Sequence, residues 1–113
     1  MNRLKSRLWV EAFLRRNQSE GKFGAVLTAG ADEAGAVYVA IHHLNGTYDL
    51  LGPPAGPSHS EIGERQFRKI FAKPVAWEEV RDHWQRQRKF DSDIWLVEIE
   101  DRDGLAGLSV LAE

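Results

Sequence analysis

The sequence contains no cysteine. Disulfide bonds, thiolate metal sites and a cysteine nucleophile are therefore excluded. It also lacks the run of about 18 consecutive apolar residues that a membrane-spanning helix requires. Near the N-terminus, Glu11, Arg15 and Arg16 interrupt the only stretch that resembles a signal peptide. These absences favour a soluble, cytoplasmic protein.

Several motifs of common enzyme classes are also missing. The chain has no glycine-rich phosphate loop, no dinucleotide-binding fingerprint, no nucleophile elbow and no HExxH zinc motif. Zinc-finger and RNP-type signatures are absent as well. The sequence thus indicates no particular reaction, and whether the protein is an enzyme stays open, with the balance toward a non-enzymatic role.

What is present is the composition of an ordinary globular protein. The 113 residues are 42% hydrophobic and 28% charged, which suits one domain spanning residues 1–113. The net charge is only −2, but residues 1–22 and 65–89 are basic whereas residues 23–64 and 90–113 are acidic. Either basic helices neutralise acidic strands, or a basic face binds an anionic partner. We favour neutralisation, because exposed charges mostly solvate a surface.

Two segments have the apolar spacing of amphipathic helices. The first covers residues 3–19, with Ser6 as its N-cap and Gly21 at its left-handed C-terminal end. The second runs from about residue 76 to residue 89, after Pro74. The apolar stripe of the second helix consists of Trp77, Val80 and Trp84.

Strands are predicted at residues 23–29, 36–44, 47–52, 65–71 and 94–100, although residues 65–71 are also compatible with a helix. Asn45-Gly46 is typical of a two-residue hairpin turn. That turn would place Leu44 opposite Thr47 and His42 opposite Asp49. Alternation then predicts one buried face, formed by Val37, Val39, Ile41, Tyr48 and Leu50.

These elements define the expected fold. The order α-β-β-β-β-α-β predicts an α+β protein with an antiparallel sheet of about five strands, covered on one face by two helices. Residues 53–60 hold three prolines and form a long loop. Residues 103–113 are predicted to be an edge strand or a frayed tail.

One candidate catalytic pair follows from the predicted hairpin. His42 and Asp49 would lie side by side, and an aspartate beside an imidazole fixes its tautomer and raises its basicity. The alternative is a solvated polar pair without catalytic role, which is the more common arrangement on a strand surface. His59 and His83 have no identifiable partner.

The most distinctive segment is residues 90–102, which is rich in carboxylates. Glu98 and Glu100 project from one face of a strand that Asp91 and Asp93 precede, and Trp95, Val97 and Ile99 are expected to face the core. Such carboxylates suit a Mg²⁺ or Mn²⁺ site of an enzyme that hydrolyses phosphate esters. The alternative is an edge strand that its charges protect from aggregation.

A weak nucleic-acid-binding surface is a further alternative. Basic residues surround Trp9 and Trp84, and this combination suits phosphate neutralisation and base stacking. Both tryptophans, however, fall on the apolar stripes of the predicted helices. We therefore expect them in the core, which makes nucleic acid an improbable partner.

The chain resembles a family of small alphaproteobacterial proteins, the domain of unknown function numbered 1491. The resemblance covers nearly the whole chain and rests on three groups of residues. They are Arg3-Leu4-Lys5 with Trp9-Val10 and Arg15-Arg16, then Gly35-Ala36, and finally Phe90-Asp91-x-Asp93-x-Trp95-x-Val97-Glu98-x-Glu100-Asp101. The resemblance implies no activity, cofactor or ligand.

The sequence therefore favours a small binding or interaction module without a cofactor. Its partner would be another protein or a second copy, held through a strand edge or the apolar tail. A divalent-metal-dependent hydrolase of phosphate esters is the main alternative.

Overall fold

The structure is a computed structural model that describes residues 5–55 and 64–112. Two helices and six strands follow in the order αββββαββ. The helices are α1 (Ser6–Ser19) and α2 (Trp77–Phe90). The strands are β1 (Gly24–Thr28), β2 (Val37–His42), β3 (Tyr48–Gly52), β4 (Gln66–Lys69), β5 (Trp95–Glu100) and β6 (Ser109–Val110).

The strands form one mixed sheet in the order β1-β5-β2-β3-β4-β6. β5 pairs antiparallel with β1 but parallel with β2, and β6 is parallel to β4. The α+β class is confirmed, whereas the expectation of an antiparallel sheet of five strands is wrong. The reason is that the chain leaves β4 through α2 and re-enters the middle of the sheet, where β5 lies parallel to β2.

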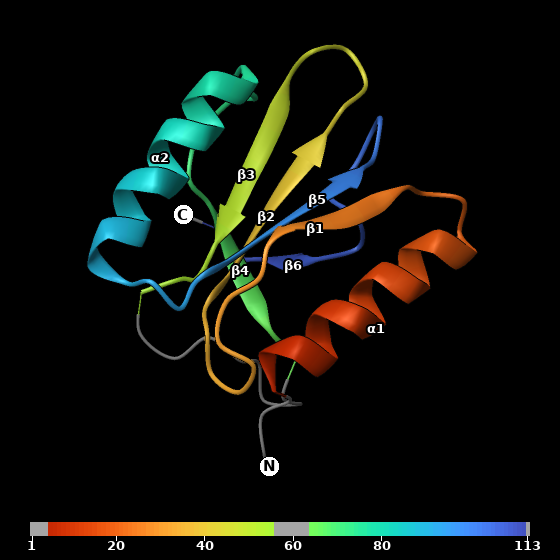
Figure 1. Ribbon diagram of the computed structural model, residues 1–113. Helices are drawn as coiled ribbons and strands as arrows, with labels where there is room; N and C mark the ends of the chain where they lie inside the picture. Colours follow the sequence, from red (N-terminus) through yellow and green to blue (C-terminus); the bar gives the residue numbers. More distant parts are fainter. Residues whose placement is uncertain (1–4, 56–63, 113) are drawn as a thin grey trace.

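The two helices cover opposite faces of the sheet, as Figure 1 shows. Val10 and Phe13 of α1 pack on one face, and Val80 and Trp84 of α2 pack on the other. The prediction of a single covered face is therefore wrong. Its physical cause is that the central strands are apolar on both sides. The residues buried on both sides of these strands are Val37, Tyr38, Val39, Ala40, Ile41, Trp95, Leu96, Val97 and Ile99.

The β2–β3 hairpin differs from its predicted register by one residue. His42 lies opposite Tyr48, and Ile41 lies opposite Asp49. The cause is a longer turn, because Leu44 joins Gly46 in a left-handed backbone conformation (φ 63° and 87°). A one-residue shift turns every β3 side chain to the other face. The five residues predicted to share one buried face are therefore divided: Val37, Val39 and Ile41 face α1, whereas Tyr48 and Leu50 face α2.

The side chain of Asn45 stabilises this longer turn. Its Oδ1 atom accepts hydrogen bonds from the backbone N–H of Thr47 at 3.0 Å and from the Thr47 hydroxyl at 2.7 Å. The His43 N–H then donates to the Thr47 carbonyl at 3.0 Å. The prediction of a turn at this position was correct, but its length depends on these local bonds.

Of the two predicted ends of α1, the C-terminal one is confirmed and the N-terminal one is wrong. Gly21 follows the helix with φ 84°, as expected. Ser6 is not the N-cap, a position that Lys5 takes without a side-chain bond. Instead, the buried Ser6 hydroxyl donates to the carbonyl of Gly35 at 2.5 Å. This bond joins the start of α1 to the turn between β1 and β2.

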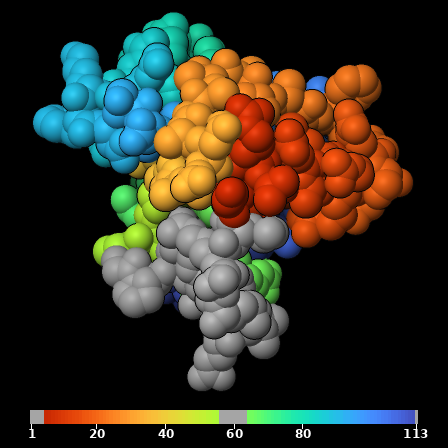
Figure 2. Space-filling view, turned by 60° about the horizontal axis from the view of Figure 1, so that its bottom comes forward, coloured from red at the N-terminus to blue at the C-terminus, as the bar shows by residue number. Residues whose placement is uncertain are grey.

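That turn packs closely against the beginning of β5. A Cβ atom on Gly30 or Gly35 would lie 2.1 or 2.2 Å from the Asp93 carbonyl oxygen. Two surface ion pairs, Lys5–Glu33 and Arg7–Asp32, hold the turn to α1. Figure 2 shows the turn (gold) beside the start of α1 (red).

Three other predictions concern less regular segments. Residues 65–71 contain the strand β4, and the tail contains the edge strand β6. Most of the predicted proline-rich loop, residues 56–60 with His59, lies outside the described residues.

Candidate functional site

A group of aromatic and acidic side chains lies on the α2 face of the sheet, beside the start of that helix. It consists of His42, Tyr48, Trp77, Glu98 and Glu100, and we call it the acidic aromatic patch. Each of these residues is partly exposed. The patch is therefore open to a ligand.

The strand register brings these residues together. His42 lies opposite Tyr48 on one neighbouring strand and opposite Glu100 on the other. Glu98 is two residues before Glu100 on β5 and therefore points to the same face. Trp77 joins them because Tyr48 and Val75 exchange two backbone hydrogen bonds of 2.8 Å, which fix the chain just before α2.

The aromatic rings of the patch are in direct contact. The His42 and Tyr48 rings stack with centroids 4.6 Å apart and planes inclined by 13°. The Trp77 ring meets Tyr48 at 5.4 Å with an angle of 53°. These distances are typical of favourable ring pairs. Tyr48 therefore contacts two rings, one almost parallel to its own and one inclined.

The patch carries a negative electrostatic potential. Burial raises the pKa of Tyr48, and the nearby carboxylates of Glu98, Glu100 and Glu78 raise it further. Within residues 5–55 and 64–112, none of these three carboxylates has an ion-pair partner. A ligand that neutralises them is thus complementary to the patch.

The predicted pair of His42 and Asp49 is not formed, because the shifted register moves Asp49 to the α1 face. There Asp49 pairs with His43, whose Nε2 lies 2.9 Å from the Asp49 Oδ2 atom. The His43 Nδ1 atom lies 2.8 Å from the carbonyl oxygen of Asp101. Both imidazole nitrogens are thus occupied inside the protein. This imidazole has no free nitrogen with which to accept a proton from a substrate.

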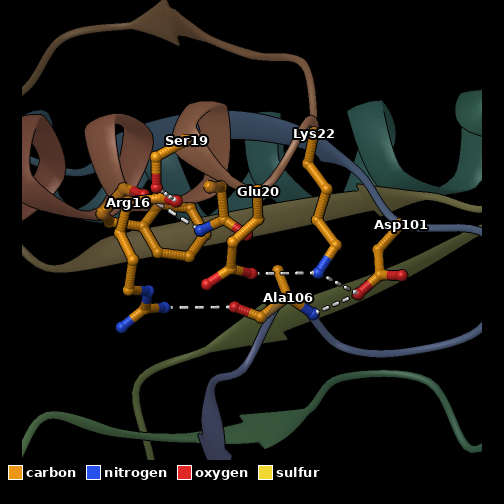
Figure 3. Close-up of polar contacts among 8 residues, drawn as sticks. Arg16, Ser19, Glu20, Lys22, Asp101 and Ala106 are labelled. Carbon is orange, nitrogen blue, oxygen red and sulfur yellow. Dashed lines mark hydrogen bonds and ion pairs between the residues drawn. The ribbon is translucent and has the colours of Figure 1, made fainter.

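Asp101, whose carbonyl contacts His43, also contacts Lys22, just after α1, through its side chain, as Figure 3 shows. Its Oδ2 atom accepts a hydrogen bond from the Ala106 N–H at 2.8 Å and lies 3.7 Å from the Lys22 ammonium group. Arg16 donates to the Ala106 carbonyl at 3.2 Å. These contacts fasten the loop after β5 to the end of α1, which is a structural role.

The four candidate metal ligands are divided between two places. Glu98 and Glu100 belong to the acidic aromatic patch, whereas Asp91 and Asp93 precede β5 at its other end. Glu100 is seven positions after Asp93 along nearly extended chain, which corresponds to roughly 23 Å. In the described ranges, no group of three or more histidine, aspartate or glutamate residues is placed to hold a metal ion.

Sequence reasoning found three members of the patch, His42, Glu98 and Glu100, because each interrupts the apolar pattern of a strand. It missed Tyr48 and Trp77, which were both expected to lie in the core. The signal for Tyr48 was its proximity to the turn, where a strand becomes accessible. No local signal indicated that Trp77 would meet it.

Neither helix of the described part of the chain is long and apolar enough to span a membrane.

Comparisons with known proteins place the chain among relatives of its own size. It is 36% identical to a protein from A. tumefaciens with a solution structure, covering 99% of this chain and 98% of that one, with a TM-score of 0.84. A crystal structure of a DUF1491 family protein from Caulobacter crescentus is 32% identical, covering 96% and 99% of the two chains, with a TM-score of 0.77. No curated protein matches.

The family comparison agrees with these structures. The profile of the family described as protein of unknown function, DUF1491, matches residues 4–109. The resemblance inferred from the sequence is therefore confirmed. The chain belongs to the DUF1491 family.

Proposed function

We propose that this protein is a non-enzymatic binding module that recognises a lysine or arginine side chain of a partner protein at the acidic aromatic patch. The observation that carries the proposal is the contact of Tyr48 with two aromatic rings, beside carboxylates that have no ion-pair partner among the described residues. An aromatic surface and an uncompensated negative charge both attract the same kind of ligand, an organic cation.

The chemistry of the two candidate side chains fits this arrangement. A guanidinium or ammonium group gains a cation–π interaction over the face of Tyr48 or Trp77. Glu98 and Glu100 can accept charge-assisted hydrogen bonds from the same group. Arginine suits the patch better than lysine, because its planar guanidinium stacks on rings and binds carboxylates in a bidentate manner.

The contacts that the histidines make favour binding over catalysis. Among the described histidines, His43 is the one with a carboxylate partner, and both of its ring nitrogens are occupied. His42 stacks on Tyr48, and no carboxylate among the described residues orients its ring by a hydrogen bond. The patch thus lacks the oriented imidazole that general-base catalysis requires.

Nuclear magnetic resonance titration tests the proposal with two short, otherwise identical peptides. One contains a central arginine, and the other contains citrulline, which keeps the shape of the side chain without its charge. We expect saturable shifts of the Tyr48 and Trp77 ring resonances with the first peptide only. The shifts should weaken as salt is added, because the patch is partly exposed to solvent.

Two substitutions localise the binding. Glu100→Gln removes one carboxylate of the patch and should weaken arginine-peptide binding. Glu11→Gln removes an exposed carboxylate of α1, on the opposite face of the sheet, and should leave binding unchanged. Equal shifts with both peptides, or equal effects of both substitutions, would contradict the proposal.

The same spectra examine the metal-dependent alternative. Under that hypothesis, Mn²⁺ should broaden the resonances of His42 and Glu98 in a saturable manner, and Glu98→Gln should abolish the effect. Such a result would replace the cation-binding proposal with a metal site. Weak, uniform broadening of all surface carboxylates would leave the proposal standing.

A further inference from the structure

β1 forms one edge of the sheet. Its neighbour is β5, and among residues 5–55 and 64–112 no strand pairs with its other side. The opposite edge is different, because β6 is only two residues long and the Leu111 N–H after it is bonded to the Phe67 carbonyl. β1, with five residues, is therefore the longer of the two edge strands.

The ladder between β1 and β5 determines which backbone groups are free. The Glu100 N–H donates to the Phe23 carbonyl at 2.8 Å, and Gly24 and Ala25 lie opposite Ile99 and Glu98. Hydrogen-bonded and non-hydrogen-bonded positions alternate along an antiparallel pair. Ala25 therefore bonds to β5, whereas the N–H and C=O groups of Gly24 and Val26 point outward.

The side chains of this edge are apolar. Residues 23–31 carry no charge, although exposed edge strands usually carry lysine or another charge that prevents pairing. Phe23 is 74% exposed and Leu27 is 43% exposed. Leu27 is the extra residue of a β-bulge, because Val26 and Thr28 lie opposite the consecutive residues Val97 and Leu96.

We propose that β1 pairs antiparallel with β1 of a second copy of this chain, around a two-fold axis at Ala25. In this register Gly24 of each copy lies opposite Val26 of the other. Each outward N–H then meets an outward carbonyl, which gives a closed set of backbone hydrogen bonds. The same register brings Phe23 of each copy opposite Leu27 of the other.

A hollow beside Phe23 supports this choice of partner. It has a volume of about 160 Å³ and is lined by Gln18, Gly21, Lys22 and Phe23. Leu27 of the second copy would arrive next to it. The edge is therefore self-complementary in its backbone groups, its apolar side chains and its shape, and a closed two-fold dimer is the assembly that uses all three.

The bulge limits the extent of this pairing. It interrupts the regular ladder at Leu27, so that regular pairing covers Gly24 to Val26. An interface of this size is at the small end of specific interfaces. We therefore expect a dimer that dissociates on dilution, rather than an obligate one.

One consequence of the dimer rests on the proposed function of the acidic aromatic patch. A two-fold axis perpendicular to the sheet keeps the same face of both copies on the same side. The two acidic aromatic patches would then face one way and could bind two cations of one partner, which raises avidity. The dimer itself does not depend on this ligand.

Sedimentation equilibrium over a range of protein concentrations tests the dimer, with no peptide present. The wild-type mass should rise from 12.8 kDa toward twice that value. Leu27→Lys places a charge opposite the apolar Phe23 of the second copy at each end of the paired segment and should keep the protein monomeric. The matched control is Leu8→Lys, which changes a leucine of α1 that is 51% exposed, against 43% for Leu27, and this variant should still dimerise.

Amide hydrogen exchange provides a second readout that does not depend on a variant. At high concentration the Gly24 and Val26 amides should be protected, and dilution should remove this protection. The Ala25 amide, bonded to β5, should stay protected at both concentrations. A monomeric mass up to the solubility limit, with unprotected Gly24 and Val26 amides, would overturn the proposal and leave the peptide experiments unaffected.

Discussion

His43 and Asp49 are held side by side in a nearly buried position, where the imidazole Nε2 and the carboxylate Oδ2 lie 2.9 Å apart. Their side chains are 11% and 6% exposed. The Asp101 carbonyl can only accept, so the His43 Nδ1 atom donates to it. A hydrogen bond between Nε2 and Oδ2 therefore requires a second proton. Each of the two side chains depends on the other for this contact.

The first prediction concerns the removal of one member of this pair. His43→Leu leaves the Asp49 carboxylate buried without its partner, and Asp49 Oδ1 already has none among the described residues. We expect a loss of about 3–5 kcal/mol in the free energy of unfolding, as for other broken buried pairs. Urea unfolding monitored by tryptophan fluorescence measures it.

The double variant His43→Leu/Asp49→Leu is the control. Replacing both members of a buried hydrogen-bonded pair by apolar residues is often nearly neutral, so most of the lost stability should return. Some loss should persist, because the Asp101 carbonyl still lacks its donor. A double variant that is as unstable as the sum of both single variants would show that the two side chains act independently.

The second prediction compares two glycines. Gly35→Ala would bring a Cβ atom within 2.2 Å of the Asp93 carbonyl oxygen, a backbone atom that cannot move aside alone. The cost should reach or exceed the upper end of the roughly 1–3 kcal/mol typical of overpacking. The Cβ atom added by Gly46→Ala would meet no atom within 4 Å, so this variant is strained only by the positive φ of residue 46. It should cost about 1–2 kcal/mol, and thermal unfolding should rank the two variants in this order.

Local sequence patterns predicted most elements of this fold, because they depend on neighbouring residues. The alternation of residues 94–100 identified the strand and the buried side chains of Trp95, Val97 and Ile99, but not the buried Leu96 on the other face. The stripe of Val80 and Trp84 identified α2. Patterns could not give the position of β5 between β1 and β2. That position depends on contacts between residues far apart in the chain, which no local pattern contains.

The candidate site was predictable to a smaller degree for a related reason. Glu98 and Glu100 were found because charge on a strand marks an accessible face. The partner of Asp49 was assigned incorrectly, because the turn is one residue longer than predicted, with Leu44 in a left-handed conformation, and this shifts the register by one residue. Tyr48 and Trp77 meet through the backbone bridge at Val75, which leaves no trace in their own spacing.

The third prediction concerns His83. Its pKa is lowered by burial against Tyr38 and Phe71, and then by the positive charges of Arg86 and Arg68. The unfolded chain therefore takes up a proton at a higher pH than the folded protein does. Stability should fall as the pH drops below about 6.5, the ordinary value for histidine, until folded His83 is itself protonated.

His83→Gln removes this titration. The difference in unfolding free energy between about pH 7.5 and about pH 5.5 should be smaller for the variant than for the wild type. Because the other histidines are common to both proteins, the comparison isolates His83. Identical differences in the two proteins would show that His83 titrates alike in the folded and unfolded states.

The last prediction concerns Asp101 at acid pH. Burial raises the pKa of its carboxyl group, but the Ala106 N–H, the Lys22 ammonium and the N–H groups of Asp103 and Gly104 together lower it below the ordinary value. The unfolded state therefore binds the proton first. This contribution to stability is complete above about pH 4, the ordinary range of aspartate, and is lost as the pH falls through the lower folded-state pKa.

Asp101→Asn should lower stability at neutral pH and flatten the acid limb of the stability profile, whereas Asp103→Asn, an exposed neighbour, should change neither. Acid unfolding followed by circular dichroism measures stability at neutral pH and along the acid limb. Parallel profiles for the wild type and Asp101→Asn would show that Lys22 and the loop contribute no net stabilisation through this carboxylate.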